Sequence, residues 1–229
     1  MRKLVSMAAV AVLCSTSALF AETSGAFLGL GVGYGNIKLQ DKFDDPNDIG
    51  GGSYKQTEKS NGVSYGFVVG YKQFFNDYLG LRYYANLDLT HGKFKSESPD
   101  GTKNSHNTTF INYGVNVDFL GNFVSNESLD FGGFIGLGIG GNTIKDKYLD
   151  DIKKAYEEAG MTSKLKTTDF DIALNVGLRT NIATNHGVEV AFRVPFMPIT
   201  VMKFSEMGMS YKSTAGQDVR FLARYTYSF

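Results

Sequence analysis

Charged residues recur at every second position of several otherwise apolar segments, and they have the clearest capacity for chemistry in this chain. They are Lys72, Arg82, Asp88, Asp118, Asp169, Asp171, Arg179, Glu189, Arg193, Arg220 and Arg224. Ions withdrawn from water must pair, because an isolated charge in a low-dielectric interior costs several kcal/mol. Inside a closed sheet, these residues predict either a packed plug of salt bridges or the charged lining of a narrow pore. An eight-stranded ring is just wide enough to be filled by side chains, which favours the plug.

Catalytic and metal-binding patterns are weak in this sequence. A nucleophile and its base need a hydroxyl and an imidazole within hydrogen-bond reach, which on one strand face means a spacing of two residues. Lys93 follows His91 at that spacing, Thr108 follows His106 in an expected loop, and His186 is the remaining histidine. No His, Cys and Asp cluster has transition-metal spacing. We therefore expect no enzyme, no metal and no cofactor.

Two further stretches resemble ligand-binding motifs only in composition. Residues 41–48 are rich in aspartate, which suggests calcium, but they lack the ordered ligand, glycine and glutamate spacing of a calcium loop. Residues 29–35 and 136–140 are glycine-rich but lie inside alternating segments with no helix after them, so they cannot cradle a phosphate. The first stretch predicts a solvated outer loop, and the glycines predict room in a crowded interior.

Eight segments with alternating apolar residues must position the charged groups. They are residues 28–35, 63–72, 79–90, 111–119, 131–140, 169–179, 188–194 and 218–229. Such alternation predicts strands with one apolar face. The apolar faces end in aromatic residues such as Tyr34, Tyr71, Phe119 and Phe229, as in the aromatic girdles of membrane barrels. These features favour an all-β, transmembrane antiparallel up-and-down β-barrel of eight strands over the alternative, an exported two-sheet sandwich.

The connectors between these segments also alternate in length. Those after odd-numbered segments are long, at residues 41–61, 95–107, 145–167 and 197–216, whereas those at 75–78, 121–128 and 183–186 are short. This predicts long extracellular loops and short periplasmic turns. Residues 198–204 and 207–211 could instead extend the last two strands above the membrane.

One long connector contains a helical pattern. Tyr148, Leu149, Ile152, Ala155 and Tyr156 recur at helical spacing and predict a short amphipathic helix ended by Gly160. Its apolar stripe would cap the barrel mouth or meet a partner.

The first residues have the composition of a targeting sequence. Arg2 and Lys3 precede an apolar stretch at 4–13 and a run of mostly small residues at 15–21. This pattern predicts a signal peptide, residues 1–21, cleaved after Ala21, with residues 22–229 as the barrel domain. The mature chain then has no cysteine and no disulfide. The full chain has 23 Lys+Arg against 23 Asp+Glu, which argues against a nucleic-acid partner.

Several motifs carry a resemblance to a known family. Residues 71–75, Tyr-Lys-Gln-Phe-Phe, followed by Gly-Leu-Arg-Tyr-Tyr at 80–84, resemble the most recognisable stretch of the Helicobacter outer-membrane protein family. Residues 113–115, 175–181 and 225–229 are also similar to it, so the resemblance covers roughly residues 62–229. It implies a β-barrel of the bacterial outer membrane whose relatives include porins and host-cell adhesins. The chain departs from the adhesins by lacking their large N-terminal extracellular region.

These observations lead to three functional hypotheses. The first is a structural or surface-interaction barrel, adhesion included, that acts through its outer loops. The alternative is a small porin passing ions or small solutes, and the third is a surface hydrolase. Tyr225, Tyr227 and Phe229 form a C-terminal assembly signature for the barrel-assembly machinery. The other expected partners are outer-membrane lipid, lipopolysaccharide and a host or environmental ligand at the outer loops.

Overall fold

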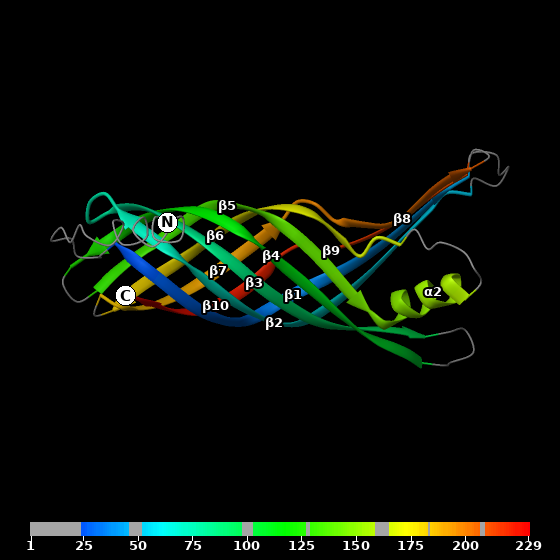
Figure 1. The fold of residues 1–229 in the computed structure, drawn as a ribbon, viewed down its shortest axis with the longest axis horizontal. Helices are drawn as coiled ribbons and strands as arrows, with labels where there is room; N and C mark the ends of the chain where they lie inside the picture. Colours follow the sequence, from blue (N-terminus) through cyan, green and yellow to red (C-terminus); the bar gives the residue numbers. More distant parts are fainter. Residues whose placement is uncertain are drawn as a thin grey trace, which may run out of the picture.

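The computed structural model describes residues 24–45, 52–97, 103–126, 129–158, 165–182, 184–206 and 209–229. The expected signal peptide and Gly160 lie outside these residues. Within them the chain forms ten strands and one helix (Figure 1). The elements are β1 Gly25–Asp44, β2 Tyr54–Phe74, β3 Leu79–Glu97, β4 Lys103–Ser125, β5 Leu129–Asp146, α2 Lys147–Glu158, β6 Thr168–Ile182, β7 His186–Pro195, β8 Ile199–Glu206, β9 Met209–Gly216 and β10 Arg220–Ser228.

Eight of these strands close into a ring. Strands β1 to β7 pair antiparallel in chain order, and β10 pairs with both β7 and β1. The closing pair is in continuous register, from Phe27 opposite Ser228 to Gly35 opposite Arg220. The predicted eight-stranded antiparallel barrel is confirmed.

The remaining two strands, β8 and β9, form a hairpin outside the ring. Strand β9 pairs with the outer half of β1, from Lys38 to Asp44. The connector 197–216 is therefore not a loop. It extends the wall above the membrane with two separate strands, because the chain between β7 and β8 contains Pro198, which cannot donate a ladder hydrogen bond.

The side chains of the ring alternate in the direction that suits a membrane. On β3, Arg82, Asn86 and Asp88 are buried in the interior, while Tyr83 and Leu87 face outward and are exposed. The same holds around the ring, where Leu30 and Leu137 on the outside are more than half exposed. Apolar side chains on the outside of a closed sheet are stable only against lipid.

Tight turns join the inner ends of the strands, and asparagine side chains form hydrogen bonds to the turn backbone. In the β2–β3 turn, the Asn76 side-chain oxygen accepts hydrogen bonds from the backbone N–H groups of Tyr78 and Leu79, both at 2.9 Å. In the β6–β7 turn, Asn181 donates to the carbonyl of Thr184, which has a left-handed φ of 69°. Asparagine favours such turns because its side chain forms hydrogen bonds to nearby backbone groups, in place of a second backbone group. The predicted short turns are confirmed.

Strands β1 to β5 are much longer than is needed to cross a membrane, and they extend beyond it at their outer ends. Strands β1 to β5 contain 18 to 23 residues, whereas about 9–11 tilted residues cross a bilayer. Most of residues 41–61 and 95–107, expected to be loops, therefore belong to strands. The prediction failed there because strands in water need no apolar outer face, so the alternation that revealed the ring disappears.

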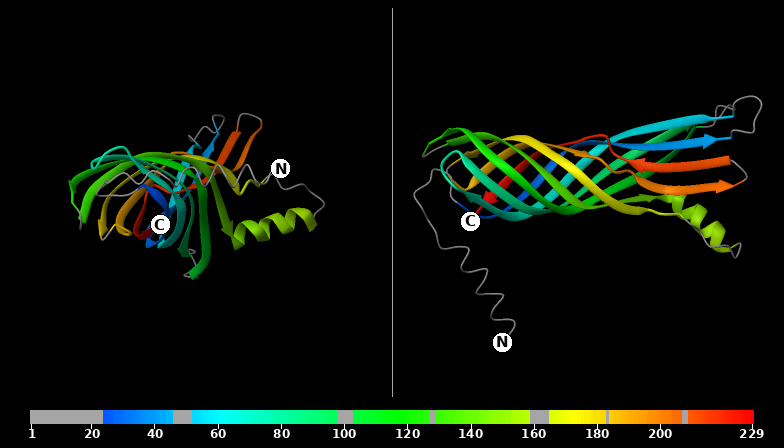
Figure 2. Two further views of the ribbon diagram at one scale, coloured as in Figure 1. Left: turned by 60° about the vertical axis from the view of Figure 1, so that its left-hand side comes forward. Right: turned by 90° about the horizontal axis from the view of Figure 1, so that it is seen from above.

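The outer extension divides into two arms, which separate at one end of the ring (Figures 1 and 2). One arm, here called the outer sheet, consists of residues 36–44 and 54–61 of β1 and β2 with β9 and β8. The other consists of the outer parts of β3, β4 and β5 with α2. An apolar core joins the arms: Ile37, Phe94, Phe110, Ile144, Ile199, Val201 and Ala215.

Helix α2 confirms the predicted amphipathic helix. Leu149 packs against the apolar core of the extension. Figure 2 shows the helix beside the outer ends of the strands, so it does not lie across the barrel mouth. No described helix is both long and apolar enough to cross a bilayer.

Candidate functional site

The ring brings most of the charged residues predicted from the sequence into its interior. Ten of the eleven are buried: Lys72, Arg82, Asp88, Asp118, Asp171, Arg179, Glu189, Arg193, Arg220 and Arg224. Asp169 differs. It lies at the outer end of β6, is partly exposed and accepts a 2.7 Å hydrogen bond from Lys166. The strand phase is right for Asp169, but this end of β6 lies beyond the interior network.

Four of the buried residues form an inner ion-pair cluster, Arg82, Asp118, Glu189 and Arg224. Arg82 and Asp118 lie directly opposite each other on β3 and β4, and Arg82 donates to Asp118 Oδ2 from Nε at 3.1 Å and from Nη2 at 2.8 Å. Arg82 Nη1 also donates across the ring to Glu189. Glu189 accepts a second bond, 3.1 Å, from Arg224 on the neighbouring strand. Each charge in the cluster is therefore paired.

Aromatic rings enclose this cluster. The Arg82 guanidinium lies 4.4 Å from the ring centre of Phe134 and 5.1 Å from that of Tyr84. Such contacts stabilise a desolvated cation. A Cβ on Gly177 would come within 2.5 Å of the Phe134 ring, so glycine is needed beside it. Sequence reasoning missed Phe134, although its position two residues from Gly132 and Gly136 already places it on the inner face.

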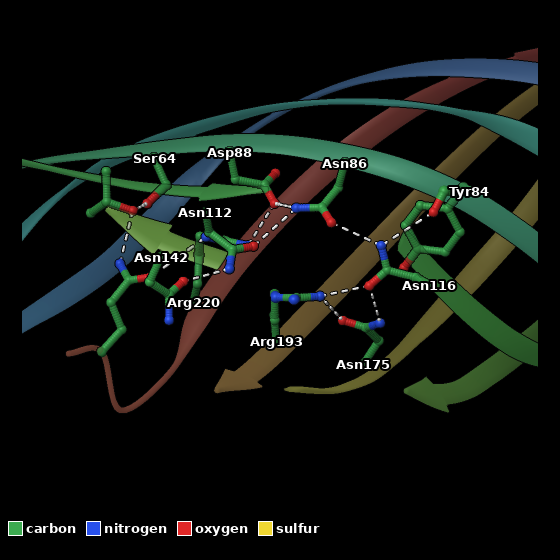
Figure 3. A network of polar contacts seen from close by, with 12 residues as sticks. Ser64, Tyr84, Asn86, Asp88, Asn112, Asn116, Asn142, Asn175, Arg193 and Arg220 are labelled. Carbon is green, nitrogen blue, oxygen red and sulfur yellow. Dashed lines mark hydrogen bonds and ion pairs between the residues drawn. The ribbon is translucent and has the colours of Figure 1, made fainter. Parts of the chain in front are cut away.

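Above the cluster, five asparagines form an amide network: Asn86, Asn112, Asn116, Asn142 and Asn175 (Figure 3). They come from β3, β4, β5 and β6, and their side chains are linked by hydrogen bonds of 2.6 to 3.0 Å. The network rigidifies the interior because four of the amides both donate and accept, while Asn142 accepts from Asn112. Asn142 lies two residues beyond the predicted segment 131–140, although its parity with Gly140 could have revealed it.

The amide network also holds two arginines. Arg220 donates to Asp88 Oδ2 at 2.6 Å. Arg193 instead donates to the amide oxygens of Asn116 and Asn175, at 2.7 and 2.9 Å. Arg193 and Arg220 lie directly opposite each other on β7 and β10. The ten buried residues comprise six cations and four carboxylates, and Asp130 and Asp146 are two further buried carboxylates.

Little space remains among these groups. A cavity of about 20 Å³ lies between residues that include Tyr84, Asn86, Arg193, Arg220 and Arg224. That volume holds about one water molecule. This arrangement can fix side chains and resist charge movement, but it offers no room for a solute.

Histidines form pairs that spacing along one strand could not reveal. His91 Nδ1 lies 2.8 Å from the hydroxyl of Thr109, its partner on the adjacent strand. His186 Nδ1 lies 2.7 Å from the Tyr225 hydroxyl. Both pairs are on the exposed outside of the sheet. Among the described residues, no group of three or more His, Cys, Asp or Glu side chains could hold a metal ion.

Two titratable groups of the outer sheet are perturbed by their neighbours. Hydrogen bonds from Lys59 and Lys38 lower the pKa of Asp218, and Lys59 contributes most. Burial and, next to it, the 2.9 Å hydrogen bond to the Asp41 carboxylate together raise the pKa of Tyr211 to about 12.

Comparison with known proteins identifies the family. Residues 66–229 match the sequence profile described as Helicobacter outer membrane protein. The chain belongs to this family. Among curated proteins, none is significantly similar in sequence. The resemblance inferred from the motifs at 71–84, 113–115, 175–181 and 225–229 is thus confirmed.

A solved outer-membrane protein shares the fold. The outer membrane protein OprG from Pseudomonas aeruginosa is 13% identical with a TM-score of 0.51, over 92% of this chain and 99% of OprG. Neisserial surface protein A is 12% identical with a TM-score of 0.45, over 91% and 100% of the two chains. Together with the family, the fold identifies a small β-barrel protein of the outer membrane, surrounded by membrane lipid.

The expected C-terminal assembly signature lies on the membrane-facing side of β10. Tyr225 and Phe229 are exposed, and Tyr227 packs edge-on against Phe229 with 5.2 Å between ring centres. Its recognition by the barrel-assembly machinery stays a prediction.

Proposed function

We propose that this barrel is closed to solutes and acts as a surface-interaction protein, with adhesion to a host or environmental ligand as its role. The observation that carries the proposal is the filled interior. Arg82 and Asp118 are at most 3% exposed and bonded to each other, and a cavity of about 20 Å³ beside them holds about one water. A route for ions would require these paired, desolvated charges to separate.

The outer extension supports the surface role. Its two arms share an apolar core that includes Phe110 and Ile144, both almost completely buried. Strands packed on such a core present their outer side chains in fixed positions, which favours recognition over non-specific contact. The function is therefore assigned to the extension rather than to the ring interior.

We also propose that the protein is not an enzyme. The exposed His91 and Thr109 pair brings an imidazole to a hydroxyl, but a nucleophile needs a base that is itself oriented by a third group. The His91 ring packs against Tyr65, with 5.2 Å between ring centres, and this contact supplies no such group.

The test of the closed barrel is conductance. The chain from residue 22, refolded in detergent and shown to be folded by its heat-shifted gel mobility, is inserted into a planar bilayer. We expect no current steps above the bare bilayer across a range of salt concentrations. Discrete steps proportional to salt would replace this proposal with the porin alternative.

Insertion requires a further partner. We propose that the barrel-assembly machinery reads Tyr225, Tyr227 and Phe229, because Tyr225 and Tyr227 belong to the last strand of the ring and Phe229 directly follows it. Replacing Phe229 with Ser should reduce the amount of folded protein in the outer membrane, measured by heat-shifted mobility of membrane fractions. The purified variant should still refold in detergent, and failure to refold would indicate a purely structural role.

A further inference from the structure

The outer sheet carries a row of four lysines on adjacent strands. Lys55 of β2 is opposite Lys42 of β1, Lys42 is opposite Lys212 of β9, and Lys212 is opposite Lys203 of β8. All four side chains are exposed. Like charges placed directly opposite each other on neighbouring strands are destabilising. Such an arrangement is therefore not explained by the stability of the sheet.

The lysine row lies on the face of the outer sheet turned away from the apolar core. Residues next to the row, Phe43, Tyr211 and Phe204, belong to the other face, which also carries Ile37. Alternation along each strand thus sends the lysines outward.

The lysines of the row have no ionic partner within the sheet. None of the ion pairs among the described residues involves them, whereas Lys38 and Lys59, four residues nearer the ring, share the carboxylate of Asp218. One carboxylate, Asp44, lies two residues from Lys42, and it accepts a hydrogen bond from Ser53. The row therefore keeps a strong positive charge.

Protection of sheet edges does not account for the row. Lysines on an exposed edge strand prevent pairing with other chains, and this reason suffices for Lys203 on β8 and Lys55 on β2. It does not suffice for Lys42 and Lys212, because β1 and β9 are the two inner strands of this sheet. These two positions gain nothing from edge protection.

The geometry fits a long anion. Neighbouring strands are about 4.8 Å apart, so the four ammonium groups extend over roughly 15 Å. The row is eight residues beyond Tyr34, the last exposed aromatic residue of the membrane-facing side of β1. At 3.3 Å per residue and a tilt near 40°, this places it roughly 20 Å above the apolar band, beyond the phosphates of the membrane surface.

We propose that the lysine row binds a linear sulfated polysaccharide outside the cell. A chain with regularly spaced sulfates can contact several ammonium groups at once, which a single phosphate cannot. This proposal rests on the surface role above and names the ligand class of the outer extension. Binding is electrostatic and therefore falls steeply with ionic strength, because exposed charges are screened beyond about 8–10 Å in physiological salt.

The test uses immobilised heparin and the folded protein in detergent. A variant with Lys42, Lys55, Lys203 and Lys212 all changed to Gln is compared with wild type. The matched control changes four exposed lysines of the other arm to Gln, Lys145, Lys147, Lys153 and Lys154, so both variants lose the same charge. We expect at least a tenfold loss of affinity at physiological salt for the row variant and less than a twofold loss for the control. Heat-shifted mobility confirms that both variants are folded.

Three results would overturn the proposal: equal losses in the two variants, no wild-type binding at physiological salt, or a row variant that loses binding to lipopolysaccharide vesicles but keeps binding to heparin. The last would assign the row to membrane phosphate. Conductance of the same preparations separates this proposal from the closed barrel. If the barrel conducts and binds heparin through the row, only the proposal of a closed barrel is wrong. If the barrel does not conduct and the row variant binds heparin as well as wild type does, only the proposed ligand is wrong.

Discussion

The ring interior and the core of the outer extension are built from the same strands with opposite chemistry. On β4, the inward face carries Asp118, Asn116 and Asn112 inside the ring, and then Phe110 in the extension. On β3 it changes from Arg82 and Asp88 to Phe94. The side chains turned outward change in the reverse sense. The medium around each half of a strand, rather than the strand itself, therefore sets the residue type.

The physical reason lies in what each surface can offer. In lipid, the outside of the ring must be apolar, and a narrow interior can be held together by buried groups that satisfy one another. In water, the extension gains stability by burying apolar area in the usual way, at about 25 cal/mol per Å². The ring is consequently sensitive to single charges and the extension to single apolar side chains.

The largest effect is expected from Arg82. Replacing it with Ala leaves the carboxylates of Asp118 and Glu189 without their shared cation in a dry interior. Breaking a buried pair in this way costs about 3–5 kcal/mol. We expect a much lower temperature for the loss of the heat-shifted folded band. Lys203→Ala in the outer sheet is the control, and an equal loss in both variants would contradict the packed plug.

A loss of similar size but local extent is expected from Phe110. The side chain is completely buried in the core of the extension, and Phe→Ala in a core costs about 3–5 kcal/mol. Because the ring has its own interior, the two arms should become sensitive to protease while the folded band persists to nearly the wild-type temperature. Loss of both together would show that ring and extension unfold as one unit.

A smaller effect is expected from Arg193. It has amide partners but, among the described residues, no carboxylate within ion-pair distance, and it faces Arg220 across β7 and β10. Removing its charge in Arg193→Gln relieves this repulsion and offsets the lost hydrogen bonds. The folded band should therefore melt close to the wild-type temperature. A loss as large as that of Arg82→Ala would mean that the interior depends on total positive charge rather than on specific pairs.

The smallest effect concerns pH and the outer sheet. The pKa of Tyr211 is raised to about 12, above the value near 10 of an unfolded tyrosine. The unfolded chain therefore loses this proton first, and the stability of the extension should decline between pH 10 and 12. Protease sensitivity measured across this range should show the decline in wild type and a weaker one in Tyr211→Phe. An identical decline in both would assign it to other tyrosines.

Much of the ring could be predicted from the sequence, because lipid on one side and a narrow interior on the other impose strict alternation. The residues that escaped prediction do so for physical reasons. Hairpin β8–β9 and the outer halves of β1 and β2 lie in water, where both faces accept polar residues and alternation fades. Contacts across strands, such as Arg193 beside Arg220 or His91 beside Thr109, depend on register, which a single strand does not contain. Asp169 has the parity of an inward-facing residue, but it lies at the outer end of β6, beyond the interior network.

Closure of the ring by β1 and β10 has a kinetic consequence. The two strands that seal the barrel lie at opposite ends of the described chain, from Phe27 to Ser228, so the seal is the contact of longest sequence separation in the ring. Folding through such distant pairs is slow, because loop closure must precede the gain of the contact. Until β10 arrives, β1 presents an unpaired edge rich in glycine, a template for pairing with other chains. The time spent in that open state, more than the stability of the finished barrel, is expected to limit how efficiently the protein reaches the membrane.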